Sequence, residues 1–138
     1  MKKHDTFVDL ARGTPMWFTL SARGLPLGIL GQFLSAGTAL FQNGEVWGLH
    51  AAVGGVLLVP AAVVFGGSLL IQRLRGFGWW AGLVVILCLT QVALAAGSQA
   101  ILLSLHPLNG ALLLSASLIL LTKVERRRAQ PPNVENAA

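Results

Sequence analysis

The sequence contains few charged residues. Only 11% of its 138 residues are Asp, Glu, Lys or Arg, which is about half the share that a soluble domain carries. Hydrophobic residues make up 54% of the chain, and the mean hydropathy is +0.70. The charges are clustered, so they leave four apolar stretches close to the roughly 20 residues that a helix needs to cross a bilayer. We therefore exclude a soluble domain and predict an all-α membrane protein with four transmembrane helices in an up-down bundle.

The expected spans follow from the positions of the charged residues. No charge occurs from residue 77 to residue 122, a length too great for one span, so the chain must turn within it, around 98–104. Residues 1–24 are predicted to form a cytoplasmic or interfacial N-terminal segment, and residues 123–138 a basic, disordered cytoplasmic tail. Pro60 is expected to kink the second span. The four-helix domain covers residues 25–122, with spans at about 25–42, 46–71, 77–97 and 105–122.

Acidic residues are rarer still, and none lies within an expected span. Small proton-coupled exporters rely on a carboxylate inside the membrane, because an intramembrane acid relays the proton. This absence disfavours a proton-coupled exporter, and a small transporter without such carboxylates is one alternative function. The five acidic residues are Asp5, Asp9, Glu45, Glu125 and Glu135.

The chain has a single cysteine, Cys88, which excludes an internal disulfide and a cysteine-based metal site. Within the third span, Cys88 is expected to act as a small buried hydrophobic residue. The sequence also lacks a nucleotide-binding loop and a Ser-His-Asp set with credible geometry. No catalytic residue is therefore assigned, and a role other than catalysis is favoured.

The basic residues predict the orientation of the chain. A four-span topology places all ten Lys and Arg on one side of the membrane, which is the cytoplasmic side by the positive-inside tendency. We therefore expect a multi-pass protein of the bacterial cytoplasmic membrane with both termini inside. The sequence pI of about 10.8 reflects this topology, so the expected partner is the lipid bilayer and not nucleic acid. The ten residues are Lys2, Lys3, Arg12, Arg23, Arg73, Arg75, Lys123, Arg126, Arg127 and Arg128.

A short motif occurs twice in the apolar region. Residues 49–58 read LHAAVGGVLL, and residues 105–114 read LHPLNGALLL. In each copy a glycine follows the histidine four positions later, so the two residues lie on the same face of a helix. Gln32 and Gln91 precede the two copies in the first and third spans, which suggests a duplicated helical hairpin. The pairs are His50 with Gly54 and His106 with Gly110.

The two histidines are expected near the outer ends of parallel spans. The second and fourth helices of an up-down bundle are diagonal neighbours, so His50 and His106 can oppose each other across the core. We expect His50 on the order of 9 Å into its helix, and His106 at a helix start with Pro107 as the first helical residue. Two imidazoles can ligate one iron from both sides. Gly54 and Gly110 would leave room for a flat macrocycle, so the predicted cofactor is haem b.

These two hairpins, each with a histidine on its second helix, resemble the four-helix half of haem A synthase and small membrane b-type cytochromes. The resemblance covers about residues 25–122 and implies haem ligation by His50 and His106 close to the outer surface. It also implies electron transfer or haem handling, with a membrane redox partner or a homo-oligomer. The chain departs from haem A synthase by having one half, no extracellular cysteine pair, and no carboxylate near the histidines except Glu45, which argues against oxygenase chemistry. The layout is also similar to small uncharacterised four-span bacterial membrane proteins.

Other interpretations of the motif stay open. The histidines can lie at the level of the lipid headgroups while the glycines serve as small-residue contacts between helices. Gln32 and Gln91 are then expected to form hydrogen bonds between helices. Another metal or a quinone is a third interpretation. A non-catalytic accessory or assembly subunit of a membrane complex would share the small-residue faces and the basic ends.

Overall fold

The computed structural model describes residues 13–97 and 99–129, and this part of the chain is almost entirely helical, without strands. Four helical segments are long and apolar enough to cross a membrane: Met16–Phe41, Val46–Leu70, Gln72–Ala96 and Ala100–Ala129. The expected fold class, an all-α membrane protein with four spans in an up-down bundle, is confirmed. Its elements are α2 (Met16–Phe41), α3 (Val46–Val56), α4 (Leu58–Leu70), the 3-10 helix η1 (Gln72–Phe77), α5 (Gly78–Ala96) and α6 (Ala100–Ala129).

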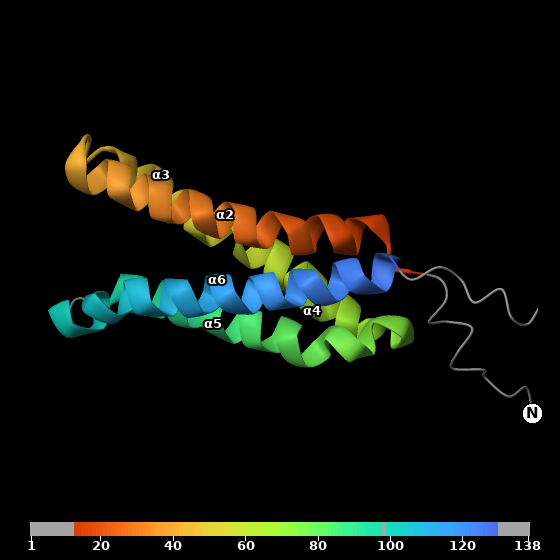
Figure 1. Ribbon diagram of the computed structural model, residues 1–138. Helices are drawn as coiled ribbons and strands as arrows, with labels where there is room; N and C mark the ends of the chain where they lie inside the picture. The colour runs from red at the N-terminus through yellow and green to blue at the C-terminus, as the bar shows by residue number, and fades with distance from the viewer. Residues whose placement is uncertain (1–12, 98, 130–138) are drawn as a thin grey trace, which may run out of the picture.

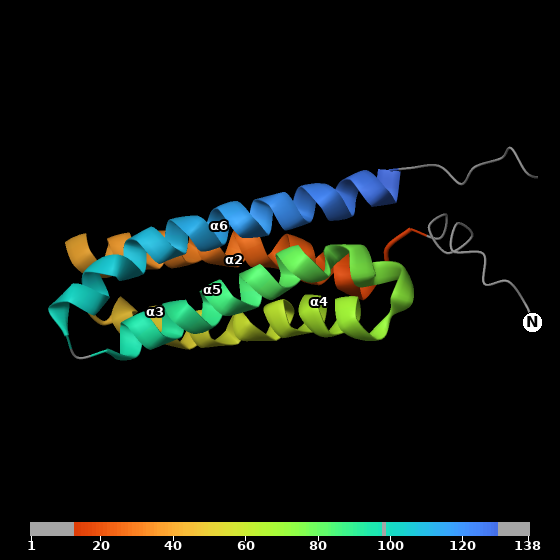
Figure 2. The same ribbon diagram turned by 90° about the horizontal axis from the view of Figure 1, so that it is seen from below.

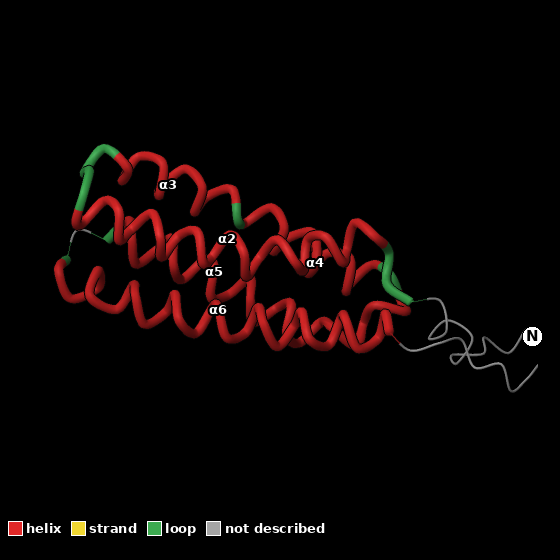
Figure 3. The backbone as a smooth tube through the Cα atoms, turned by 45° about the horizontal axis from the view of Figure 1, so that its top comes forward, coloured by secondary structure: helices red, strands yellow, loops and turns green. Residues whose placement is uncertain are grey.

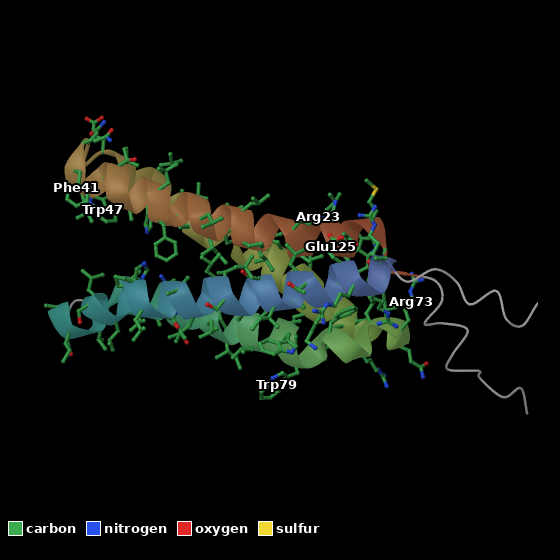
Figure 4. The ribbon with its side chains drawn as sticks, in the orientation of Figure 1. Arg23, Phe41, Trp47, Arg73, Trp79 and Glu125 are labelled. Carbon is green, nitrogen blue, oxygen red and sulfur yellow. The ribbon has the colours of Figure 1, made fainter. Side chains whose placement is uncertain are left out.

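The spans pack in a ring, as Figures 1 and 2 show from two directions. Helix α2 lies between α6 on one side and α3 with α4 on the other, and α5 lies between α4 and α6. The second and fourth spans are therefore diagonal, as expected. Figure 4 shows Arg23, Arg73 and Glu125 at one end and Phe41 and Trp47 at the other. We call the first end the basic end, because it carries Arg23, Arg73, Arg75, Lys123, Arg126, Arg127 and Arg128, and the opposite one the histidine end.

The first span begins earlier than expected. Helix α2 starts at Met16 and not at residue 25, so residues 16–24 belong to the same helix as the first span. The reason is an apolar stripe at helical spacing, in which Phe18, Ala22 and Leu25 are all fully buried. Arg23 lies outside this stripe, and its Nε donates to Glu125 Oε1 of α6 at 2.6 Å. Residues 1–12 lie outside the described residues.

The fourth span is also longer than expected at both of its ends. Helix α6 starts at Ala100, so the chain turns around 97–99 and not over 98–104, and Pro107 lies inside the helix and is not its first residue. A proline inside a helix removes one main-chain hydrogen bond, which membrane helices tolerate. The helix continues to Ala129 because Leu120 and Val124 are both fully buried. Residues 123–129 are thus helical, and residues 130–138 lie outside the described residues.

The second span is interrupted, which confirms the expected kink. Helix α3 ends at Val56 and α4 begins at Leu58, and Figure 3 shows the interruption as a short green segment between two red helices. Pro60 explains the break, because it has no N–H for the carbonyl of Val56 and its ring crowds that carbonyl. The side chain of Leu57 at the break lies directly against Gly28 of α2, where a Cβ atom would clash. The kink therefore directs α3 along α2.

The hydrophobic core fills the middle and the basic end of the bundle. Its members come from α2, α4, η1, α5 and α6, whereas α3 contributes no buried residue. Cys88 is 4% exposed and belongs to this core, as expected for a small buried hydrophobic residue. The spans are consequently held together most firmly at the basic end. The core residues are Phe18, Ala22, Leu25, Ile29, Ala61, Val64, Leu74, Phe77, Ala81, Val84, Cys88, Leu113, Ala116, Leu120 and Val124.

Gly67 packs closely against two aromatic rings of α2. A Cβ atom at Gly67 would lie 2.7 Å from Cη2 of Trp17 and 3.2 Å from Cδ2 of Phe18. We expect Gly67→Val to lower the free energy of unfolding by about 1–3 kcal/mol, because the added side chain forces rigid aromatic rings apart. Thermal unfolding in detergent measures this change. Gly66→Val is the control, because a Cβ atom at Gly66 has nothing within 4 Å, and equal destabilisation by both variants would contradict the prediction.

Candidate functional site

A cavity of about 410 Å³ lies at the histidine end of the bundle, between the hairpin of α2 and α3 and the hairpin of α5 and α6. It exists because α3 packs against α2 and makes hardly any contact with α5 or α6. Most of its wall is apolar, with Phe33 at one side and Cys88 and Leu113 among the buried residues. The wall contains the histidine and glycine of both motif copies and the glutamine that precedes each copy: Gln32, His50, Gly54, Gln91, His106 and Gly110.

The two histidine rings lie close together in the wall of the cavity. Their centroids are 6.2 Å apart and their planes are inclined by 55°. One metal between two imidazole nitrogens needs two bonds of about 2.0 Å, and each nitrogen lies about 1.1 Å from its ring centre, so the centres would be about 6 Å apart. The observed separation of His50 and His106 therefore suits a single metal held from both sides.

The depths of the two histidines differ from the sequence-based expectation. His50 is the fifth residue of α3 and His106 the seventh residue of α6. At 1.5 Å per residue these positions lie roughly 6 Å and roughly 9 Å from the helix starts. His106 thus lies farther from the start of its helix than expected, because α6 begins at Ala100 and not next to Pro107.

A hydrogen-bond chain holds the ring of His50. Nδ1 of His50 lies 2.9 Å from Oγ of Ser35 in α2, and this Oγ donates to the carbonyl oxygen of Gln32 at 3.0 Å. If the single hydroxyl proton of Ser35 goes to that carbonyl, its oxygen accepts the Nδ1 proton of His50, in the tautomer that carries its proton there. This tautomer leaves Nε2 without a proton and free to bind a metal. Trp47 packs edge-on against the same ring at 5.3 Å.

His106 has a different environment. Its Nδ1 is buried and has no hydrogen-bond partner within residues 13–97 and 99–129. The polar side chains nearby hold the backbone of α6: Gln91 Nε2 donates to the carbonyl oxygen of His106 at 3.0 Å. Asn109 Nδ2 donates to the carbonyl oxygen of Leu87 at 2.9 Å and also to Oε1 of Gln91. Gln91 thus forms the hydrogen bonds between helices that the sequence suggests, and these bonds fix the turn of α6 that carries His106.

Each glycine of the repeat faces the glutamine of its own hairpin. A Cβ atom at Gly54 would lie 3.0 Å from Oε1 of Gln32, and one at Gly110 would lie 3.3 Å from Nε2 of Gln91. The second position is also 3.3 Å from Cζ of Phe33. The repeated order of glutamine, histidine and glycine therefore corresponds to a repeated contact between the two helices of a hairpin. Both glycines line the cavity beside their histidines, and their role toward a cofactor stays a prediction.

Sequence reasoning missed Ser35 as a partner of His50. The available signal was weak: Ser35 is a polar residue in an apolar span, one turn after Gln32 on the same helix face. Its contact with His50 depends on how the turn between α2 and α3 aligns the two helices. That alignment cannot be read from helical spacing alone.

A comparison with protein families gives a match over residues 32–100, to a group described as "Family of unknown function (DUF6220)". This match covers half of the 138-residue chain. The chain belongs to DUF6220. No curated protein and no solved structure matches this DUF6220 chain. The matched region contains Gln32, His50, Gly54 and Gln91, and it ends at the first residue of α6, before His106.

Proposed function

We propose that this membrane protein binds one haem b in the cavity at its histidine end, with His50 and His106 as the two axial ligands. The observation that supports this most directly is the meeting of two imidazole rings from diagonal spans at a separation of 6.2 Å in the wall of an apolar cavity. The likeness to the four-helix half of haem A synthase and to small membrane b-type cytochromes is part of this proposal.

The donor set suits haem better than a metal held by protein alone. Within residues 13–97 and 99–129, no group of three or more His, Cys, Asp or Glu side chains comes together. Two imidazoles on opposite sides are the ligands expected where a macrocycle supplies the other four nitrogens. Haem would contribute one-electron redox chemistry at this position, and the protein would contribute ligation, orientation and an apolar environment.

The shape and polarity of the cavity support the same ligand. Its volume lies in the range of about 300–1,000 Å³ that small-molecule sites occupy. Gly54 and Gly110 add no side chain of their own to the wall beside each histidine, and the apolar lining suits a porphyrin face. In the described chain all Lys and Arg lie at the basic end, so the propionates would extend from the histidine end into water.

The orientation belongs to this proposal as well. The basic end would face the cytoplasm, following the positive-inside tendency, in a bacterial cytoplasmic membrane. The cavity would then lie near the outer surface, where a membrane redox partner or a second copy of the chain exchanges electrons or haem with it. We propose electron transfer or haem handling as the role.

An absorption spectrum tests haem binding. We expect the protein, expressed with ample haem and purified in detergent, to show a low-spin spectrum whose Soret band shifts on reduction with dithionite. The ratio of haem to protein should approach one. A protein that stays colourless under these conditions would contradict the proposal and favour a non-catalytic accessory or assembly subunit.

A further inference from the structure

The rings of the two histidines are supported unequally. His50 is fixed by the hydroxyl of Ser35 at 2.9 Å and by the edge of Trp47. His106 has no such support, because its Nδ1 is buried without a partner in the described chain. The nearest polar side chains are already engaged, Gln91 with the backbone of α6 and with Asn109.

This difference affects how strongly each ring can bind a metal. A histidine that binds through Nε2 carries its proton on Nδ1, and a hydrogen-bond acceptor for that proton strengthens the ligand. Ser35 supplies the acceptor for His50. For His106 the same tautomer places a buried N–H group where no acceptor lies, which is unfavourable. The bond from His106 is therefore the weaker of the two.

The helix backbone next to His106 lacks one of its main-chain hydrogen bonds. Pro107 has no N–H, so the carbonyl of Leu103 lacks its helical hydrogen bond one turn before His106. The cavity beside the ring is lined by apolar groups such as Phe33 and Leu113. If the His106 ring moved away, its coordination position on the metal would therefore open into an apolar space.

The following inference depends on the proposed function. We propose that His106 is an exchangeable ligand and that a small neutral diatomic molecule, such as carbon monoxide, binds in the cavity in its place. In this exchange the bond from Nε2 of His106 to the metal breaks, and His106 keeps its lone pair. The diatomic molecule donates its own lone pair to the vacated position. No electron or proton is transferred, and His50 remains bound throughout.

Carbon monoxide tests the exchange directly. The dithionite-reduced, haem-loaded protein is expected to show a new, sharper Soret band when carbon monoxide is added. An unchanged low-spin spectrum at saturating carbon monoxide would overturn this inference and leave the proposed function standing. A protein that takes up no haem would overturn the proposed function, and the inference with it.

The variant Ser35→Ala identifies which histidine is displaced. With carbon monoxide bound, His50 would be the only protein ligand, so weakening it should speed haem loss to an excess of haem-free globin. We expect Ser35→Ala to accelerate this loss at least about fivefold more in the carbon monoxide form than in the untreated reduced form. Ser21→Ala, in the same helix but outside the cavity wall, should change neither rate. Equal acceleration in both forms would show that His106 is not the exchangeable ligand.

Discussion

The variant His50→Ala is expected to retain about a tenth or less of the haem bound by the unaltered protein. Loss of a partner behind a metal ligand already costs about 10–100-fold in affinity, and loss of the ligand itself should cost more. His50 is the better supported of the two rings, through Ser35 and Trp47, so its removal should be the more damaging. His106→Ala should lose the low-spin spectrum and retain more haem than His50→Ala. The haem-to-protein ratio of the purified variants measures both effects.

The control for these variants is Leu49→Ala. Leu49 precedes His50 in α3 and is 60% exposed, so its removal leaves the cavity unaltered. Helix α3 contributes no buried residue, so His50→Ala should also unfold at nearly the same temperature as the unaltered apoprotein. Retention of the complete low-spin spectrum by His50→Ala would show that this ring is not a ligand.

The variant Gly54→Leu is expected to weaken haem binding at least about tenfold while leaving the bundle folded. Gly54 lines the cavity one turn from His50, and even a Cβ atom there would approach Oε1 of Gln32 to 3.0 Å. Because Gly54 lines the cavity, a leucine there is expected to displace Gln32 and to take up part of the space that the macrocycle needs. Each factor of ten corresponds to about 1.4 kcal/mol of binding free energy. Titration of the apoprotein with haem, followed by absorbance, measures the change.

Gly48→Leu provides a matched comparison in the same helix. It adds the same side chain to α3, but a Cβ atom at Gly48 has nothing within 4 Å, and Gly48 does not line the cavity. Haem affinity in Gly48→Leu should equal that of the unaltered protein. Equal weakening in both variants would mean that helix propensity, and not occupied space, causes the loss.

The number of spans and their diagonal arrangement could be predicted because bilayer thickness sets the length of an apolar helix. The ends of the spans could not. Helix α2 continues through Arg23 to Met16, where the guanidinium of Arg23 pairs with Glu125, which lies far away in the sequence. Such a pair becomes visible only when α2 and α6 are placed side by side. In α6, Pro107 suggested a helix start, but the five apolar or small residues before Leu105 extend the helix to Ala100.

The residues of the cavity wall that belong to the repeated motif could be predicted from the sequence. His50 and His106 came together because both lie near the same end of the second and fourth spans, which run in the same direction, and Gly54 and Gly110 follow them by one helical turn. The hydrogen bond from His50 to Ser35 was not predictable, since it joins two helices whose relative rotation depends on the turn at 42–45. The unequal support of the two histidine rings arises from this contact, so it could be recognised only from the structure.

The absence of α3 from the core has a consequence for which substitutions this protein can tolerate. The side chains that hold the spans together lie in the middle and at the basic end, and α3 takes no part in that core. Substitutions in the part of α3 that lines the cavity should therefore change folding stability little. Related proteins could therefore bind a different ligand in this cavity, or none, while the same four-helix bundle still inserts into the membrane and folds.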